Sequence, residues 1–331
     1  MMADVNITNN GVNTPQLEPL VENRPPFTVR AKKVFKKIWS DKLIYLMILP
    51  VVVYYVIFRY LPMAGISIAF YDYKILKGFS GSKFVGFKNF ITFFSNPDFF
   101  KLLYNTIILN VYSLLFCFTA PIIFALLLNE LRNKRFKKTV QTISYLPYFL
   151  STVVVVGMIY NLLSPTTGSI NALLKSMGKG SINFLQEPKY FRPIYITSGM
   201  WQGVGWGSIV YLSALTSIDQ ELYEAAMVDG ASRFKRVIHV TLPSIKNTIM
   251  VMLILQIGNL MSVGFEKVFL LQQPTNYSVS EVLSTYIYRL GITNANYSLA
   301  TAVGLFNSVV SLALVYFSTY LSKKYTETTL L

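Results

Sequence analysis

The feature that most constrains this chain is a series of long stretches without a charged residue. They cover 43–58, 102–129, 139–174, 193–218, 247–265 and 290–322. A bilayer core about 30 Å thick is crossed by about 20 helical residues, and five of these stretches reach or nearly reach that length. Arg59 extends the first stretch, because its charged head can snorkel from a helix end. We therefore predict an all-α, polytopic membrane protein.

Six transmembrane helices are predicted, near 43–62, 102–128, 143–163, 193–215, 247–271 and 299–321. Only 14% of the residues are charged, against about 25% in a soluble domain, which argues against an ordinary soluble enzyme. A single His argues against most zinc, haem and Ser-His-Asp chemistry. Cys117 is the only Cys, so an internal disulfide is excluded.

The connecting segments differ in their content of Lys and Arg, which number 18 in one alternating set and 10 in the other. The richer set is 1–42, 129–142, 216–246 and 322–331, and the poorer set is 63–101, 164–192 and 272–298. Basic residues favour the cytoplasmic side of a membrane. We therefore expect the richer set, and with it both termini, to be cytoplasmic.

The start of the chain precedes the predicted membrane domain. Residues 1–30 are polar, with several Asn and four Pro, and lack the basic and apolar regions of a signal peptide. We expect a disordered cytoplasmic tail over 1–30 and a basic juxtamembrane segment over 31–42, which favours anionic lipid heads. The transmembrane domain then occupies 43–331.

The most informative connection is the predicted cytoplasmic loop 216–246. Asp219 can cap a helix, and Gly230 suits a left-handed helix stop. Ser232 can cap a second short helix before Pro243 and the next span. Small residues lie on one face of the first helix, so this face is flat enough for close approach by another protein. We predict a helix-turn-helix on the cytoplasmic surface.

Within this loop the sequence resembles a known family. Glu224-Ala225-Ala226, three residues, Gly230, nine residues and Val240-Thr241-Leu242-Pro243 match the EAA motif of ABC importer permeases, with Val240 in place of Ile. Three further segments resemble the polysaccharide and complex-oligosaccharide branch of these MetI-like permeases: Arg59–Gly65, Leu127–Glu130 and Gly203–Gly207. The resemblance extends from about residue 40 to the C-terminus.

The resemblance implies a permease subunit of a type I ABC importer with the MetI-like transmembrane fold, in the cytoplasmic membrane of a bacterium. It implies a second, homologous permease, two cytoplasmic ATPase subunits and an extracellular solute-binding protein as partners, with no nucleic acid. The EAA helix then inserts into a cleft of the ATPase. The residues carried over to this coupling role are Glu224, Ala225, Ala226, Asp229, Gly230, Leu242 and Pro243.

The sequence has no G-x-x-x-x-G-K-[ST] loop to hold nucleotide phosphates. The upstream Gly is missing before Gly178-Lys179. We therefore expect no catalytic centre, no metal and no cofactor in this chain, with ATP and Mg bound by the partner ATPase.

The resemblance also implies that sugar contacts lie within the helices on either side of the EAA loop. The candidates are Trp201, Gln202, Trp206, Gln256 and Asn259. Aromatic faces and amide donors suit sugar rings, and residues three or four apart share a helix face. The alternative interpretation is hydrogen bonding between helices and interfacial anchoring by Trp.

Glu266 is the only acid within a predicted span, and Lys267 follows it directly. We expect a local ion pair near the outer end of that span, with a gating or substrate role as the alternative.

Two other kinds of function stay open at this point. An ion- or proton-coupled secondary transporter needs ionisable residues near the midplane and usually an inverted repeat, and neither is detected. A membrane-embedded glycan-processing enzyme needs a polar catalytic cluster at the interface, and the sequence shows no D-x-D or His-acid pair. The importer of oligosaccharides or polysaccharide fragments by alternating access is therefore the favoured function.

Overall fold

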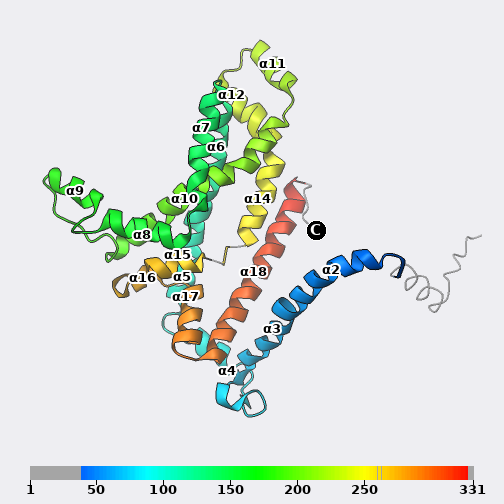
Figure 1. The fold of residues 1–331 in the computed structure, drawn as a ribbon, viewed down its shortest axis with the longest axis vertical. Coiled ribbons are helices and arrows are strands. Elements are labelled where there is room, and N and C mark those ends of the chain that lie inside the picture. Colours follow the sequence, from blue (N-terminus) through cyan, green and yellow to red (C-terminus); the bar gives the residue numbers. More distant parts are fainter. Residues whose placement is uncertain (1–38, 259, 262, 327–331) are drawn as a thin grey trace, which may run out of the picture. The chain divides into compact units, whose positions relative to one another are not determined.

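The computed structural model describes residues 39–258, 260–261 and 263–326, which are almost entirely helical (Figure 1). The chain divides into two compact units, Met1–Ala64 and Gly65–Leu331. The predicted tail and most of the basic segment 31–42 lie outside the described residues. The all-α membrane fold predicted from the sequence is confirmed.

The helical elements in chain order are α2 (Lys42–Tyr55), η1 (Val56–Tyr60), α3 (Leu61–Met63), η2 (Ala64–Phe70), η3 (Ile75–Lys77), α4 (Lys88–Phe94), α5 (Phe99–Tyr112), η4 (Ser113–Phe118), α6 (Thr119–Asn129), α7 (Lys134–Tyr145), η5 (Leu146–Phe149), α8 (Thr152–Leu163), α9 (Ser169–Ser176), α10 (Pro188–Thr216), α11 (Gln220–Val228), α12 (Arg233–Arg236), η6 (Val237–Thr241), α13 (Leu242–Ser244), α14 (Lys246–Gly258), α15 (Phe265–Leu271), η7 (Pro274–Asn276), α16 (Tyr277–Ser280), α17 (Leu283–Tyr288), η8 (Arg289–Thr293) and α18 (Tyr297–Thr326). The short strands β1 (Tyr71–Asp72) and β2 (Lys83–Phe84) pair antiparallel.

Three helical runs are long and apolar enough to cross a membrane: Lys42–Phe70, Phe99–Asn129 and Tyr297–Tyr320. The number rises to five if each of two bent helix pairs counts as one span. α10 has 29 residues, about 43 Å of helix, but its polar and glycine residues keep it out of the apolar set. The described residues are thus consistent with the six predicted spans.

The helix predicted over 143–163 is wrong as one continuous helix. α7 ends in η5, and α8 leaves at an angle of 99° to the preceding helix. Pro147 lacks the N–H that would continue the helical ladder, and Leu150 is extended. Ser151 then caps α8 by accepting from the N–H of Val154 at 3.4 Å.

The helix predicted over 247–271 is also not continuous, because α14 ends at Gly258 and α15 begins only at Phe265. α14 instead forms a bent pair with the preceding helix, Arg233–Ser244, at 64°. Gly258 lets α14 approach α18, since a Cβ there would lie 3.0 Å from Cγ2 of Val315.

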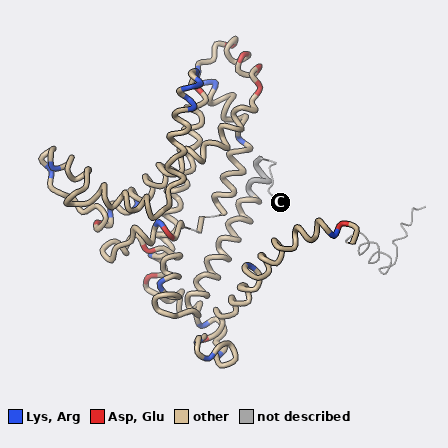
Figure 2. Tube along the Cα trace, in the orientation of Figure 1, with Lys and Arg blue, Asp and Glu red and all other residues tan. Residues whose placement is uncertain are grey.

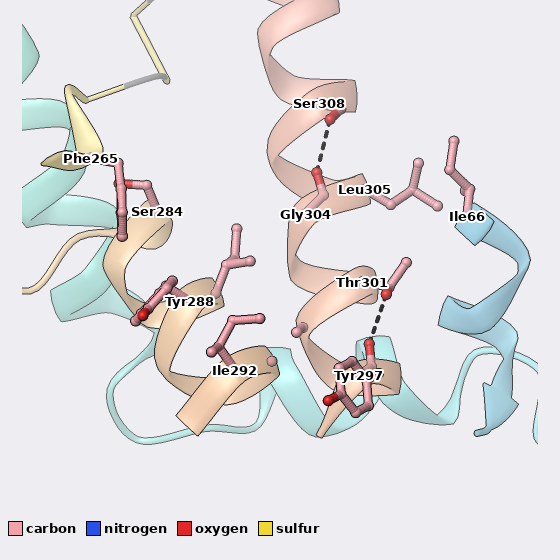
Figure 3. Close-up of a pocket in the computed structure, with 13 residues that line it drawn as sticks. Ile66, Phe265, Ser284, Tyr288, Ile292, Tyr297, Thr301, Gly304, Leu305 and Ser308 are labelled. Atoms are coloured by element: carbon pink, nitrogen blue, oxygen red, sulfur yellow. Dashed lines mark hydrogen bonds between the residues drawn. The ribbon is translucent and has the colours of Figure 1, made fainter. Parts of the chain in front are cut away.

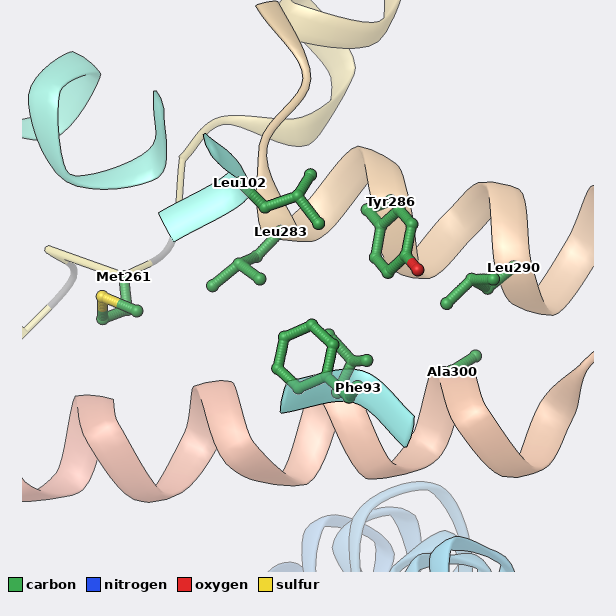
Figure 4. Packing of buried hydrophobic residues seen from close by; sticks show 8 residues of the cluster. Phe93, Leu102, Met261, Leu283, Tyr286, Leu290 and Ala300 are labelled. Carbon is green, nitrogen blue, oxygen red and sulfur yellow. The ribbon is translucent and has the colours of Figure 1, made fainter. Parts of the chain in front are cut away.

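The second unit is held together by clusters of buried apolar side chains. One joins α4, α5, α17 and α18 through Phe93, Leu102, Leu283 and Val303 (Figure 4). A second joins α6, α10 and the start of α14 and contains Ile122, Ala125, Leu128, Tyr211, Leu212, Leu215, Ile218 and Ile245. We call it the α6–α10–α14 cluster.

Charged residues gather at the ends of the helices (Figure 2). Lys and Arg of α7 and α12 lie at one end of the second unit, close to the acids of α11, while the middle of the long helices is almost free of charge. This distribution is expected of a protein whose middle is surrounded by hydrocarbon.

Candidate functional site

The loop 216–246 folds into two short capped helices. The Asp219 carboxylate accepts a hydrogen bond from the N–H of Glu221 at 3.0 Å and starts α11. The Ser232 hydroxyl accepts from the N–H of Lys235 at 3.4 Å and starts α12. Both caps predicted from the sequence are confirmed, and each satisfies a backbone donor that the helix itself leaves unpaired.

α11 ends in a Schellman motif. Gly230 has φ +72°, the N–H of Gly230 donates to the carbonyl of Met227 at 3.0 Å, and the N–H of Ala231 donates to the carbonyl of Ala226 at 2.9 Å. These two bonds satisfy the last carbonyls of the helix. The left-handed stop at Gly230 is confirmed, and it is a conformation that side chains with a Cβ adopt at a cost.

One side chain fastens α11 to the rest of the protein. Tyr223 packs against the α6–α10–α14 cluster, and its hydroxyl lies 3.0 Å from the buried Thr241 hydroxyl. Thr241 donates to the carbonyl of Arg236 at 3.3 Å, so the bond between the two hydroxyls is donated by Tyr223. This contact links α11 to the segment that leads into α14.

The rest of α11 faces outward. Glu224, Ala225, Asp229 and Gly230 are exposed, and Ala226 is half-buried. The apolar side chains of Leu222 and Met227 are about half exposed, and Val228 is 88% exposed. Leu242 is half-buried and Pro243 exposed at the start of α13. An exposed helix of this composition is suited to a protein partner.

α10 presents a second group of candidate residues to the break between α7 and α8. The Gln202 amide donates to the carbonyl of Leu150 at 3.0 Å. The Trp206 ring stacks on Tyr148, with centroids 4.7 Å apart and an angle of 6° between the planes. Phe149 meets the same ring edge-on at 5.6 Å. Sequence-predicted Gln202 and Trp206 therefore lie together against one segment, η5 and Leu150.

Gly205 permits this close approach. A Cβ at that position would lie 2.0 Å from the carbonyl oxygen of Ser144 in α7. Gly207 sits against Pro121 of α6, where a Cβ would lie 3.0 Å from the proline ring. The glycines of α10 thus set its distance from its neighbours.

Comparison with known proteins assigns the family. Residues 120–327 match the family of binding-protein-dependent transport system inner membrane components. This chain belongs to that family. It is 47% identical to Protein LplB of Bacillus subtilis (strain 168) over 287 residues, 87% of this chain and 90% of that protein. It is 46% identical to the polygalacturonan/rhamnogalacturonan transport system permease protein YteP of the same organism, over 90% of this chain and 93% of YteP.

Solved structures agree with the assignment. The permease matches a chain of a bacterial ABC transporter involved in the import of the acidic polysaccharide alginate, with a TM-score of 0.82 and 44% identity over 89% of this chain and 99% of that one. A related structure, in complex with an alginate pentasaccharide-bound periplasmic protein, matches with a TM-score of 0.83 and 44% identity over 90% and 100% of the two chains. The chain is therefore an inner-membrane transport component, not a secondary transporter or a glycan-processing enzyme.

The other pathway candidates of the permease have different surroundings from those of Gln202 and Trp206. Trp201 is 45% exposed and lines a cavity of about 380 Å³ between α8, α9 and α10. Gln256 is exposed on α14, which packs against α10. Asn259 lies outside the described residues. A role for these residues in the pathway stays a prediction.

Sequence reasoning missed the partners of Gln202 and Trp206. Tyr148, Phe149 and Leu150 stood inside a predicted span, and their distance from α10 in the chain gave no signal of contact. Leu146-Pro147, followed by Ser151, was the available sign of a helix break and a new helix start.

The expected ion pair between Glu266 and Lys267 is not formed. Glu266 is exposed. The ammonium of Lys267 is buried without a hydrogen-bond partner among the described residues, and it lies 5.6 Å from the centre of the Tyr195 ring. Neighbours in a helix point about 100° apart, which explains why adjacent residues do not pair.

A pocket of about 620 Å³ lies between α17, η8 and α18, with Ile66 and Phe265 at its sides (Figure 3). Its lining is mainly apolar. The Thr301 hydroxyl donates to the carbonyl of Tyr297 at 2.7 Å, and the Ser308 hydroxyl donates to that of Gly304 at 2.9 Å. These two hydroxyl protons are used within α18, whereas the Ser284 hydroxyl in the lining has no hydrogen-bond partner among the described residues.

Proposed function

We propose that this permease carries an oligosaccharide or polysaccharide fragment across the cytoplasmic membrane by alternating access, driven by ATP hydrolysis in a separate subunit. The names of similar proteins support this substrate class: YteP is named for polygalacturonan and rhamnogalacturonan, and the solved transporters import alginate. The observation that carries the proposal is the exposed α11, which is anchored through Tyr223 and bears the EAA residues.

The proposed assembly contains this chain, a second homologous permease, two cytoplasmic ATPase subunits and an extracellular solute-binding protein. The family description and the periplasmic protein bound in one solved relative support the binding protein. ATP and Mg belong to the ATPase subunits. The proposed contact of this chain with these subunits is α11, through Glu224, Ala225, Ala226, Asp229 and Gly230, together with Leu242 and Pro243 of α13.

Coupling follows from the contacts of α11. Closure of the ATPase dimer displaces α11, and Tyr223 transmits the displacement to Thr241 and to the α6–α10–α14 cluster. Since this cluster joins the ends of α10 and α14 next to the loop, both helices move with it. Close-packed elements shift as units rather than deform continuously, so the movement reaches the middle of the membrane.

The orientation in the proposal places both termini and the loop 216–246 in the cytoplasm, with one transmembrane domain over 43–331. The Lys and Arg of α7 and α12 support it, because they lie at the α11 end of the second unit (Figure 2). The proposed pathway residues are Trp201, Gln202, Trp206 and Gln256, together with Asn259.

Purification of the tagged chain in mild detergent tests the proposal. We expect an ATPase with a phosphate-binding loop and a second permease to co-purify in stoichiometric amounts, identified by mass spectrometry. A single species of this chain that transports sugar alone contradicts the proposal.

A further inference from the structure

Two basic side chains on the outer half of the membrane domain have no acidic partner among the described residues. Lys267 of α15 buries its ammonium, and Arg192 of α10 buries its Nε, each without a hydrogen-bond partner. The Arg192 Nη2 donates to the neutral Asn105 side chain at 3.0 Å, and its guanidinium lies 5.3 Å from the Tyr104 ring centre. Both cations are thus held by neutral groups alone.

The acids near these cations are already engaged or turned away. Asp98, Glu187 and Glu281 form ion pairs with Lys101, Lys189 and Arg289, respectively. Glu266 is exposed, although it precedes Lys267 in the chain. Burial of a cation without a counter-charge is unfavourable, so the protein keeps Lys267 in this position at the expense of stability.

Both cations lie along one face of α10. Residues 192, 195, 199, 202 and 206 share this face at intervals of three or four. The Lys267 ammonium lies against its middle, since a Cβ on Gly199 would be 3.6 Å from Nζ. The positions of Arg192 and Gly199 are about 10 Å apart along the helix axis. Gln202 and Trp206, the proposed sugar contacts, continue the same face towards the α11 end of the helix.

We propose that Lys267 and Arg192 bind carboxylates of the transported sugar, so that the substrate is an acidic, uronate-containing oligosaccharide. This inference rests on the proposed function and narrows its substrate class. When α15 separates from α10 in the transport cycle, the ammonium of Lys267 and the guanidinium of Arg192 face the pathway. A chain with carboxylates on separate sugar units then supplies the counter-charge that the protein itself lacks, and charge-assisted hydrogen bonds form.

Two side chains of the same type make a matched pair of variants. Lys267 is buried without an acid, whereas Lys189 lies on the surface at the start of α10 and pairs with Glu187 at 2.8 Å, a hydrogen bond that raises the pKa of Lys189. Lys267→Met and Lys189→Met remove the same charge and keep a similar volume. Replacement of a buried, unpaired ammonium by an apolar side chain does not destabilise the fold.

The experiment measures uptake into proteoliposomes that contain matched amounts of the complete importer with its binding protein. The substrates are tetragalacturonate and its carboxyl-reduced counterpart, which has the same backbone without charge. We expect Lys267→Met to lower tetragalacturonate uptake about tenfold, as for a lost charge-assisted bond, and to leave uptake of the reduced oligomer unchanged. Lys189→Met changes neither, and Lys267→Arg retains most of the acidic uptake.

Equal loss with both oligomers, or no loss with tetragalacturonate, overturns the inference. Loss in Lys267→Arg as large as in Lys267→Met also overturns it, because that pattern indicates packing. If the wild-type importer carries the reduced oligomer but not tetragalacturonate, the inference of an acidic substrate is overturned and the proposed function stands. If the importer takes up neither oligomer when ATP is supplied, the result counts against the proposed function itself.

Discussion

Single atoms decide how closely α10 packs. Gly205→Ala would place a Cβ 2.0 Å from the Ser144 carbonyl oxygen, which belongs to the backbone and cannot rotate away. We expect a loss of about 1–3 kcal/mol of stability, as for other overpacked sites. Gly203→Ala is the matched control, because a Cβ there meets nothing within 4 Å. Thermal unfolding of the purified complex measures both, and equal stability of the two variants contradicts the packing described for Gly205.

Gly230 is the other residue whose backbone matters. Its φ of +72° is costly for a β-branched side chain, by about 1–2 kcal/mol. Gly230→Val should therefore disturb the end of α11 and uncouple ATP hydrolysis from transport. Gly230→Asn is the control, because Asn tolerates this conformation. Normal transport per ATP hydrolysed by Gly230→Val, at wild-type amounts of complex, places the coupling contact elsewhere.

At the scale of elements, two side chains of α10 contact the segment between α7 and α8, and we expect their substitution to have different effects. Trp206 is 42% exposed beside Tyr148, so Trp206→Ala should raise the half-saturating sugar concentration. The loss of an aromatic contact of about 0.5–1.5 kcal/mol corresponds to a rise of roughly 2–13-fold in the half-saturating sugar concentration. Gln202→Ala leaves the Leu150 carbonyl without its donor and should lower thermal stability. Sugar uptake at several concentrations and thermal unfolding distinguish the two, and unchanged concentration dependence in Trp206→Ala assigns Trp206 to packing.

The sequence predicts some elements well and others poorly, for a physical reason. The apolar stretch 102–128 becomes the helix Phe99–Asn129, and 193–215 lies within α10. The stretches 143–163 and 247–271 are also rich in apolar residues, but the helix breaks within each. Hydropathy predicts burial in lipid and carries no information on the continuity of the helical ladder. Local chemistry marked the caps at Asp219 and Ser232 and the stop at Gly230, since these act within a few residues. Contacts such as Trp206 with Tyr148, or Lys267 with Tyr195, depend on tertiary packing and left no local pattern.

At the scale of the whole molecule, the topology is open to labelling. Arg233→Cys in α12 and Lys179→Cys after α9 are exposed positions on a Cys117→Ser background. We expect a membrane-impermeant thiol reagent to label Lys179→Cys from outside and Arg233→Cys only after the cytoplasmic side is opened, because basic loops face the cytoplasm. Labelling of both from the same side rules out the six-span arrangement.

We propose that this chain is the membrane path of an importer that is driven by ATP hydrolysis in a partner subunit. The most direct test is sugar uptake by proteoliposomes containing the complete assembly, with the binding protein on one side. We expect accumulation of oligosaccharide only when ATP and Mg are present on the opposite side, the side of α11. Uptake by this chain alone, driven by an ion gradient and indifferent to ATP, would contradict it.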